Sequence, residues 1–271
     1  MDPLTGLFDI STTEVFVFFL VLVRCSIVLT LFPFFGDKTI PQLVKILFSF
    51  VIAIAFYPLL KKSHAFDLVL NDAWIASPVG ILTQVCLEAI FAFALSFIAK
   101  TIFDALNFGS YLIGSFMGFG SAATFDNHQE SYASIVSQFQ MVFIMLLFLS
   151  LGGHSMLIQA LYKSYEIVGI GCMRINQDVN NIFISLGGFV IAFAFQVSAP
   201  VSLSVFLVNV TFGVMAKTMP QLNIYSISSI VTTLIGIMLL IVDAPELEPI
   251  VSFVIEQMQM HMFEFFKTAL L

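Results

Sequence analysis

Long apolar runs constrain this chain more than any other feature of its sequence. They extend over Val15–Phe35, Leu43–Leu60, Val79–Ala99, Ile102–Phe119, Phe139–Leu161, Ile182–Ala216 and Ile227–Val242. A helix needs about 20 mainly apolar residues to cross the hydrocarbon core of a bilayer. Because backbone polar groups in lipid must bond within the segment, runs of this length are predicted to be helices. The sequence therefore predicts an all-α, polytopic membrane protein.

The number of helices depends on how the sixth run is divided. This run is long enough for two helices, and Pro200 is the expected break between them because proline interrupts helical hydrogen bonding. Seven or eight helices result. Other residues typical of helix ends lie between the runs: Pro33, Pro41, Pro220 and Asn223.

Composition supports the membrane class and excludes some functions. Of 271 residues, 59% are hydrophobic and only 10% are charged, whereas soluble domains carry about 25% charged residues. The formal net charge of −7 argues against nucleic acid as a partner, because its phosphates are bound by basic patches. We expect a lipid membrane as the environment of the chain.

The chain is expected to form one hydrophobic helical unit, residues 1–242, followed by an acidic amphipathic tail, residues 243–271. The tail is predicted to be a helix outside the core, and it carries Asp243, Glu246, Glu248, Glu256 and Glu264. Lys and Arg occur at almost every connection, so the expected alternation of positive loops is absent. This pattern indicates either a weak topology signal or helices that do not cross a bilayer in ordinary up-and-down order.

Two charged residues lie within apolar runs. These are Arg24 in the first run and Glu88 in the third. A charge at the centre of a bilayer costs roughly 3 kcal/mol on insertion scales, so such residues normally face a partner or a water-filled cavity. A structural ion pair, contacts with another subunit, and a proton-relay role for Glu88 all remain open from the sequence.

The segment Ser110–Asp126 is rich in small residues. Ser110, Gly114 and Gly118 are spaced by four, a pattern that favours close packing of helices. The alternative is a soft apolar seal, because hydrophobic constrictions close pores by excluding water. The residues that would form this seal are Gly114, Phe116, Met117, Gly118, Phe119, Gly120 and Asp126.

Residues for catalysis or cofactor binding do not form any recognisable motif. The three cysteines form no CxxC motif, and the four histidines show no metal-binding spacing. Motifs for a nucleophile elbow, a P-loop or a dinucleotide fold are also missing. We therefore expect no enzyme activity, no metal site and no cofactor.

Nearly the whole chain resembles the FliR family of export-gate subunits and its injectisome counterpart, SctT. The resemblance begins with Arg24, Pro33-Phe34-Phe35-Gly36 and Ile40-Pro41, and continues through Glu88 and Gly114–Asp126. The matching residues further along are Leu147-Phe148-Leu149, Gly152-Gly153-His154, Pro200, Asn209 and Pro220-Gln221-Leu222-Asn223-Ile224-Tyr225. The acidic tail departs from the family pattern.

This resemblance implies a subunit of a bacterial flagellar type III protein-export gate. It implies assembly with FliP- and FliQ-type subunits into a closed helical complex in the inner membrane, at the centre of the flagellar basal body. An FlhB-type subunit would surround the base of that complex. The plug that closes the channel against unfolded export substrates would map to Gly114–Asp126.

Three alternatives remain open from the sequence. An injectisome subunit would export effectors instead of flagellar proteins. A small-molecule secondary transporter would have paired repeats around a site at the membrane midplane; only the similarity of Lys38–Leu43 to Lys217–Leu222 hints at such repeats. An intramembrane enzyme would need converging catalytic side chains.

Overall fold

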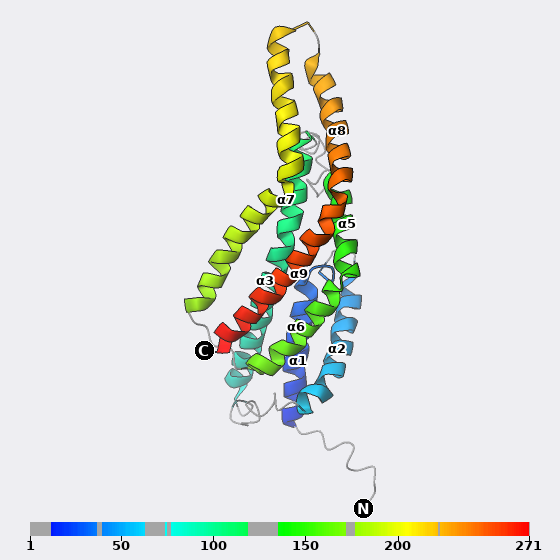
Figure 1. Cartoon of the computed structure of the whole chain (residues 1–271). Coiled ribbons are helices and arrows are strands. Elements are labelled where there is room, and N and C mark those ends of the chain that lie inside the picture. Colours follow the sequence, from blue (N-terminus) through cyan, green and yellow to red (C-terminus); the bar gives the residue numbers. More distant parts are fainter. Residues whose placement is uncertain are drawn as a thin grey trace, which may run out of the picture. The chain divides into compact units, whose positions relative to one another are not determined.

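The computed structural model describes residues 12–36, 40–62, 74, 77–118, 135–171, 177–221 and 223–270. These residues form the α-helices α1 (Thr12–Leu31), α2 (Gln42–Lys62), α3 (Pro78–Phe116), α5 (Ile135–Ser150), α6 (Gly153–Val168), α7 (Gln177–Thr218), α8 (Ile224–Asp243) and α9 (Leu247–Leu270). The 3-10 helix η2 (Ala244–Glu246) joins α8 to α9. The described residues include no strand. The predicted all-α fold class is confirmed (Figure 1).

Five of the described segments are long and apolar enough to cross a membrane, or six if α5 and α6 together form one broken span. The five are Thr13–Leu31, Gln42–Lys62, Pro78–Phe116, Val179–Thr218 and Ile224–Ala269. Polytopic helical architecture is therefore confirmed.

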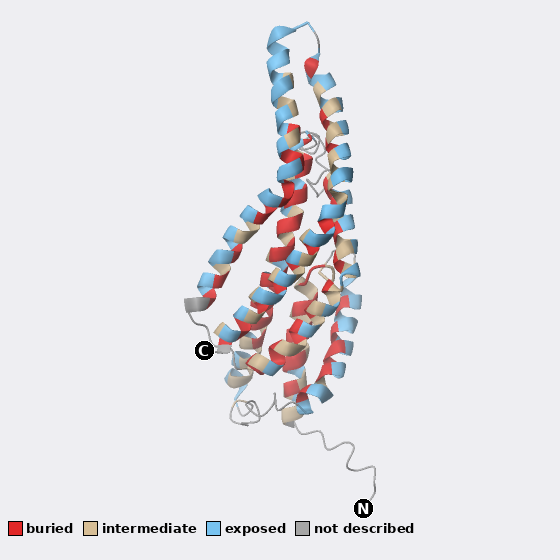
Figure 2. Cartoon of the chain, viewed as in Figure 1, coloured by how far each residue is buried: buried red, intermediate tan, exposed pale blue. Residues whose placement is uncertain are grey.

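The chain divides into two compact units. The first contains Met1–Lys100, His154–Ile184 and Met258–Leu271, and the second contains Thr101–Gly153 and Ser185–Gln257. In the first unit, α1 supplies the most deeply buried apolar side chains, including Val21, Val28 and Phe32, each at 0% exposure. Helix α2 lies beside α1 and buries only one side, as Figure 2 shows.

In the second unit, a small apolar cluster joins the end of α3 to α7. Its buried members are Ile113, Met117, Val201 and Val205, and Leu240 of α8 packs against them. Helices α7 and α8 form an antiparallel hairpin, which is seen in yellow and orange in Figure 1.

Two predicted helix boundaries are wrong. The third and fourth apolar runs form a single helix, α3, because Lys100 is an exposed side chain on a continuous helix and does not interrupt it. Pro200 lies inside α7 and does not end it. The proline removes one backbone donor, which bends a helix more readily than it stops one, and α7 is bent in its middle part (Figure 1).

The predicted fifth helix is divided into α5 and α6. Leu151 and Gly152 separate them, and Gly152 has a φ of 78°, a left-handed conformation that favours glycine and ends a helix. His154 lies in the first turn of α6.

The remaining residues predicted at helix ends lie between helices. Pro33 follows α1, Pro41 directly precedes α2, and Pro220 lies between α7 and α8. Asn223 caps α8: its side-chain oxygen accepts a hydrogen bond from the Ser226 backbone N–H at 3.4 Å.

The C-terminal segment differs from the expectation of a helix outside the core. Helix α9 is amphipathic, with Glu248, Glu256 and Glu264 exposed. Its other face is fully buried at Val251, Val254, Met258, Met262, Phe265, Phe266 and Ala269. The apolar residues recur every three or four positions, so one stripe of the helix packs inward while the acidic residues remain outside.

Candidate functional site: a buried arginine–glutamate pair

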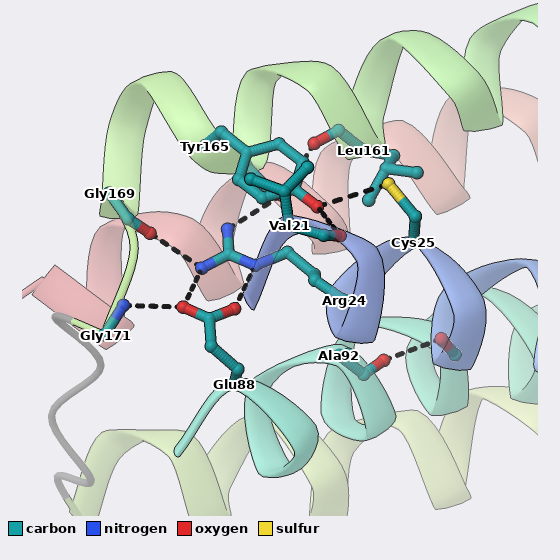
Figure 3. Close-up of polar contacts among 11 residues, drawn as sticks. Val21, Arg24, Cys25, Glu88, Ala92, Leu161, Tyr165, Gly169 and Gly171 are labelled. Atoms are coloured by element: carbon teal, nitrogen blue, oxygen red, sulfur yellow. Dashed lines mark hydrogen bonds and ion pairs between the residues drawn. The ribbon is translucent and has the colours of Figure 1, made fainter. Parts of the chain in front are cut away.

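Three helices bring the two buried charges together. Arg24 lies near the middle of α1 and Glu88 in the first half of α3, and each residue is 1% exposed. Ser164 of α6 and the chain that follows α6 complete the site. Figure 3 shows Gly169 and Gly171 of that chain beside the two charges. All of these residues belong to the first compact unit.

The pair is bidentate. Arg24 donates from Nε to Glu88 Oε2 at 2.6 Å and from Nη2 to Glu88 Oε1 at 2.9 Å. This parallel arrangement is the strongest geometry available to an arginine and a carboxylate. Of the alternatives left open by the sequence, the mutual ion pair is the one in the structure.

Neighbouring groups complete the hydrogen bonding of both charges. Arg24 also donates to the Ser164 hydroxyl at 3.2 Å and to the Gly169 carbonyl at 2.6 Å. The Gly171 backbone N–H donates to Glu88 Oε1 at 2.5 Å. Gly169 and Gly171 have φ values of 72° and 70°, conformations that favour glycine, and they turn the backbone toward the charges.

Two aromatic rings enclose the guanidinium. Its central carbon lies 4.4 Å from the centroid of Phe91 and 4.3 Å from that of Tyr165. Phe91 in turn stacks on Phe265 and Phe266 of α9, with centroids 5.3 Å and 6.3 Å apart. The C-terminal helix therefore packs against the ring that covers the arginine.

Tyr165 also ties α6 to α1 through its hydroxyl. The hydroxyl donates to the Val21 carbonyl at 3.0 Å and lies 3.3 Å from the Cys25 sulfur (Figure 3). The hydroxyl and ring of one residue thus contact both the backbone of α1 and the arginine that α1 carries.

This arrangement is suited to holding helices together. Both oxygens of Glu88 accept hydrogen bonds, and two aromatic rings pack against the guanidinium. A buried pair of this kind costs desolvation, which close geometry and additional hydrogen bonds offset. Within the described residues, no group of three or more His, Cys, Asp or Glu side chains is placed to hold a metal ion.

The predicted seal is partly described. Gly114 and Phe116 lie in the last turns of α3, and Gly118 follows with a φ of 90°. Met117 is 2% exposed and packs in the cluster with α7, whereas Phe116 is 37% exposed. Phe119, Gly120 and Asp126 lie outside the described residues.

The backbone at the end of α3 is fastened to α7. Asn209 donates from its side-chain nitrogen to the Phe116 carbonyl at 3.2 Å, and the Phe116 ring meets Phe206 edge-on at 6.4 Å. The buried side chain of Met117 adds to this fastening by packing against α7.

Sequence reasoning missed most of the residues around the ion pair. Phe91, Ser164, Tyr165 and the glycines that follow α6 were not singled out. One signal was available: Phe91 lies three residues after Glu88 and so shares its helix face. Nothing in the sequence distinguishes Tyr165 from the other tyrosines.

Together, the apolar helices and the buried pair define a polytopic helical membrane protein stabilised by an internal ion pair. The sequence model of the family described as "Bacterial export proteins, family 1" matches residues 15–258. The chain belongs to this family of bacterial export proteins.

Three similar proteins from different bacteria share the same name. The chain is 27% identical over 228 residues to "Flagellar biosynthetic protein FliR" of Bacillus subtilis, covering 83% of this chain and 85% of the relative. The protein of the same name from Aquifex aeolicus is 25% identical over 239 residues, covering 88% and 89%. That of Escherichia coli is 22% identical over 232 residues, covering 86% and 85%.

Proposed function

We propose that this protein is the FliR-type membrane subunit of a flagellar type III protein-export gate. The match to the export-protein family over residues 15–258 carries the proposal. The name shared by its relatives points to the flagellar system, which makes an injectisome role the second choice. The protein would act in the inner membrane at the centre of the flagellar basal body, as a secretion component without catalytic activity.

The proposed partners are FliP- and FliQ-type subunits, an FlhB-type subunit and unfolded export substrates. The apolar outer surface supports stable partners. Helix α2 alone exposes Leu43 at 67%, Ile46 at 63% and Val51 at 60%. Apolar patches of this extent are covered by lipid or by other subunits.

Co-expression tests this proposal directly. The chain would be produced alone and together with FliP- and FliQ-type subunits, then solubilised and separated by size. We expect one discrete assembly with the subunits and heterogeneous or aggregated protein without them. A pure monomer that is unchanged by those subunits, or solute uptake by the lone protein in liposomes, would instead favour a secondary transporter.

The segment that begins at Gly114 is proposed as the plug of the export channel. A seal must exclude water at rest and yield to a passing chain, which requires apolar side chains on a backbone of low local stability. Met117 anchors one end of the segment in the α7 cluster, while Phe116 is partly exposed beside it. The resemblance to the family plug supports the same residues.

The plug is tested by replacing Phe116 and Phe119 with Ala, and separately by shortening the segment. We expect the gate to assemble and the cells to become permeable to ions and small solutes. The control is Phe195→Ala, which removes an exposed ring from α7 eleven residues before Phe206, the residue whose ring meets Phe116. An intact gate with unchanged permeability would refute the plug, whereas loss of the gate would favour a packing role.

A further inference from the structure

An acidic cavity lies within the second unit, among α3, α5, α7, α8 and the start of α9. It has a volume of about 290 Å³, and its walls are mainly apolar, with Val201 and Leu240 among them. Its polar lining consists of Gln140, Gln196, Asp243 and Glu246. The described residues that line it include no Lys and no Arg.

The two carboxylates lie on one face of the chain. Asp243 and Glu246 are three residues apart, and the backbone between them is helical, with φ and ψ of −80° and −12° at Asp243 and −54° and −39° at Ala244. Residues at this spacing are neighbours on a helix surface. Two carboxylates on neighbouring turns therefore line the same mainly apolar cavity.

Gln140 lines both this cavity and a neighbouring hollow, and it carries an unpaired buried acceptor. Its side chain is 5% exposed, and its Oε1 atom is buried without a hydrogen-bond partner among the described residues. Buried polar atoms are normally paired, so an unpaired carbonyl oxygen on a residue that lines the same cavity as two carboxylates favours an occupant rich in N–H donors.

An apolar groove continues from this cavity between α5 and α8. It has a volume of about 480 Å³ and shares Gln140, Leu240 and Leu247 with the cavity. The groove is lined by Phe139 and Ile241 from opposite helices. The shared residues make the two hollows one continuous surface, apolar along its length and acidic at one end.

Three kinds of occupant would bring positive charge to this surface. A hydrated cation would bind the carboxylate and amide oxygens but would make no contact with the apolar walls of the cavity or with the groove. A phospholipid with an ammonium headgroup would place its phosphate beside Asp243 and Glu246, and the described lining residues offer no basic side chain to offset the repulsion. A lysine or arginine has an apolar stem and a donor-rich head, and it matches both parts.

We propose that an apolar helix of a neighbouring gate subunit lies in the α5–α8 groove and inserts one basic side chain into the cavity. The basic head binds Asp243, Glu246 and the Oε1 atom of Gln140. This inference rests on the proposed function, because it takes the neighbour to be another subunit of the export gate.

The test uses the chain co-expressed with FliP- and FliQ-type subunits. A photoreactive amino acid is placed at Leu240, which lines both hollows, and for comparison at Leu234, which is 63% exposed on α8 outside both. Cross-linked products are identified by mass spectrometry. A second set of gates carries Asp243→Asn with Glu246→Gln, or Gln140→Leu. The matched control is Glu248→Gln, an exposed carboxylate that does not line the cavity.

The expected result is a cross-link from position 240 to a peptide of another subunit that carries Lys or Arg within one helical turn of the attachment point. The double variant and Gln140→Leu should each lower gate recovery at least tenfold at equal levels of the chain in the membrane, and the control should not. Reversing the charge of the identified basic residue should be rescued by Asp243→Lys.

Several outcomes would overturn the inference. A cross-link from position 240 to lipid alone, or to a peptide without a basic residue, refutes it whether or not the variants fold. Full recovery of the double variant also refutes it. In each of these cases the unaltered chain still assembles, so the proposed function stands. Failure of the unaltered chain to assemble with the subunits instead refutes the proposed function, and this inference with it.

Discussion

The sharpest prediction concerns the buried pair. Replacing Arg24 with Leu leaves Glu88 as an uncompensated charge, and Glu88→Leu does the same to Arg24. Each side chain is 1% exposed, so water cannot replace the lost partner. Removing one member of a buried pair costs about 3–5 kcal/mol, and the two single changes together would therefore sum to about 6–10 kcal/mol.

The double variant removes both charges at once. It leaves the Gly169 carbonyl and the Gly171 N–H without their side-chain partners. A buried polar group left unpaired costs about 1–3 kcal/mol, so the double variant should lose about 2–6 kcal/mol. The coupling between Arg24 and Glu88 is then expected to be about 4 kcal/mol, far above the scatter of independent sites.

The assay is recovery of the assembled gate after solubilisation and heating over a series of temperatures. The midpoint of loss should fall strongly in both single variants and recover in the double variant. Glu14→Gln provides the matched control, because Lys61 and Glu14 form a partly exposed ion pair in the same unit, with 58% and 29% of their side chains exposed. That change should leave the midpoint nearly unchanged. Single effects that add fully in the double variant would refute the mutual pair in the assembled gate.

Three further changes probe the packing of the helices, and each is measured by the same thermal assay. Phe265→Ala removes a fully buried ring that stacks on Phe91 and should cost about 3–5 kcal/mol; an effect below 1 kcal/mol would show that α9 is not part of this core. Asn223→Ala removes the cap of α8 and should cost about 1 kcal/mol, whereas Asn223→Asp should retain most of the stability. Gly236→Leu should be destabilising by about 1–3 kcal/mol, because a Cβ atom there would lie 2.5 Å from the Met117 methyl group, and Met117→Ala should relieve it.

The sequence predicted the helical class because the signal for it is repeated along the whole chain. The signal was weaker for helix boundaries, where a single residue decides whether a helix continues or ends. The runs that end at Ala99 and begin at Ile102 predict two helices, yet the lysine between them, Lys100, is a good helix former and its long side chain can reach a polar environment. Pro200 was taken as a break, yet α7 continues through it. The true break, at Gly152, lay inside an apolar run where hydropathy gives no signal.

At the candidate site, the sequence likewise predicted which charged residues are unusual but not which residues they contact. Arg24 and Glu88 stood out because a charge within an apolar run is rare. That they meet each other depends on the packing of α1 against α3 across 64 residues of sequence, which no local pattern records. Phe91 and Tyr165 could not be selected from 32 Phe and 6 Tyr, because their role comes from where the helices place the rings.

The distribution of polar groups explains why this chain should depend on partners. Several buried serines, among them Ser49, Ser96 and Ser110, donate to the carbonyl four residues earlier in their own helix. Each serine hydroxyl has its hydrogen-bond partner within its own helix, and its small side chain lets another helix approach closely. It does not determine which helix that neighbour is.

The large apolar side chains on the outside do not select a particular neighbour either, since they can pack equally well against lipid and protein. Unpaired polar atoms and charges are better suited to specify a neighbour, and in the docking proposed above Gln140 lines one cavity together with Asp243 and Glu246. A subunit that supplies the missing donors gains specificity there, while the apolar faces supply contact area.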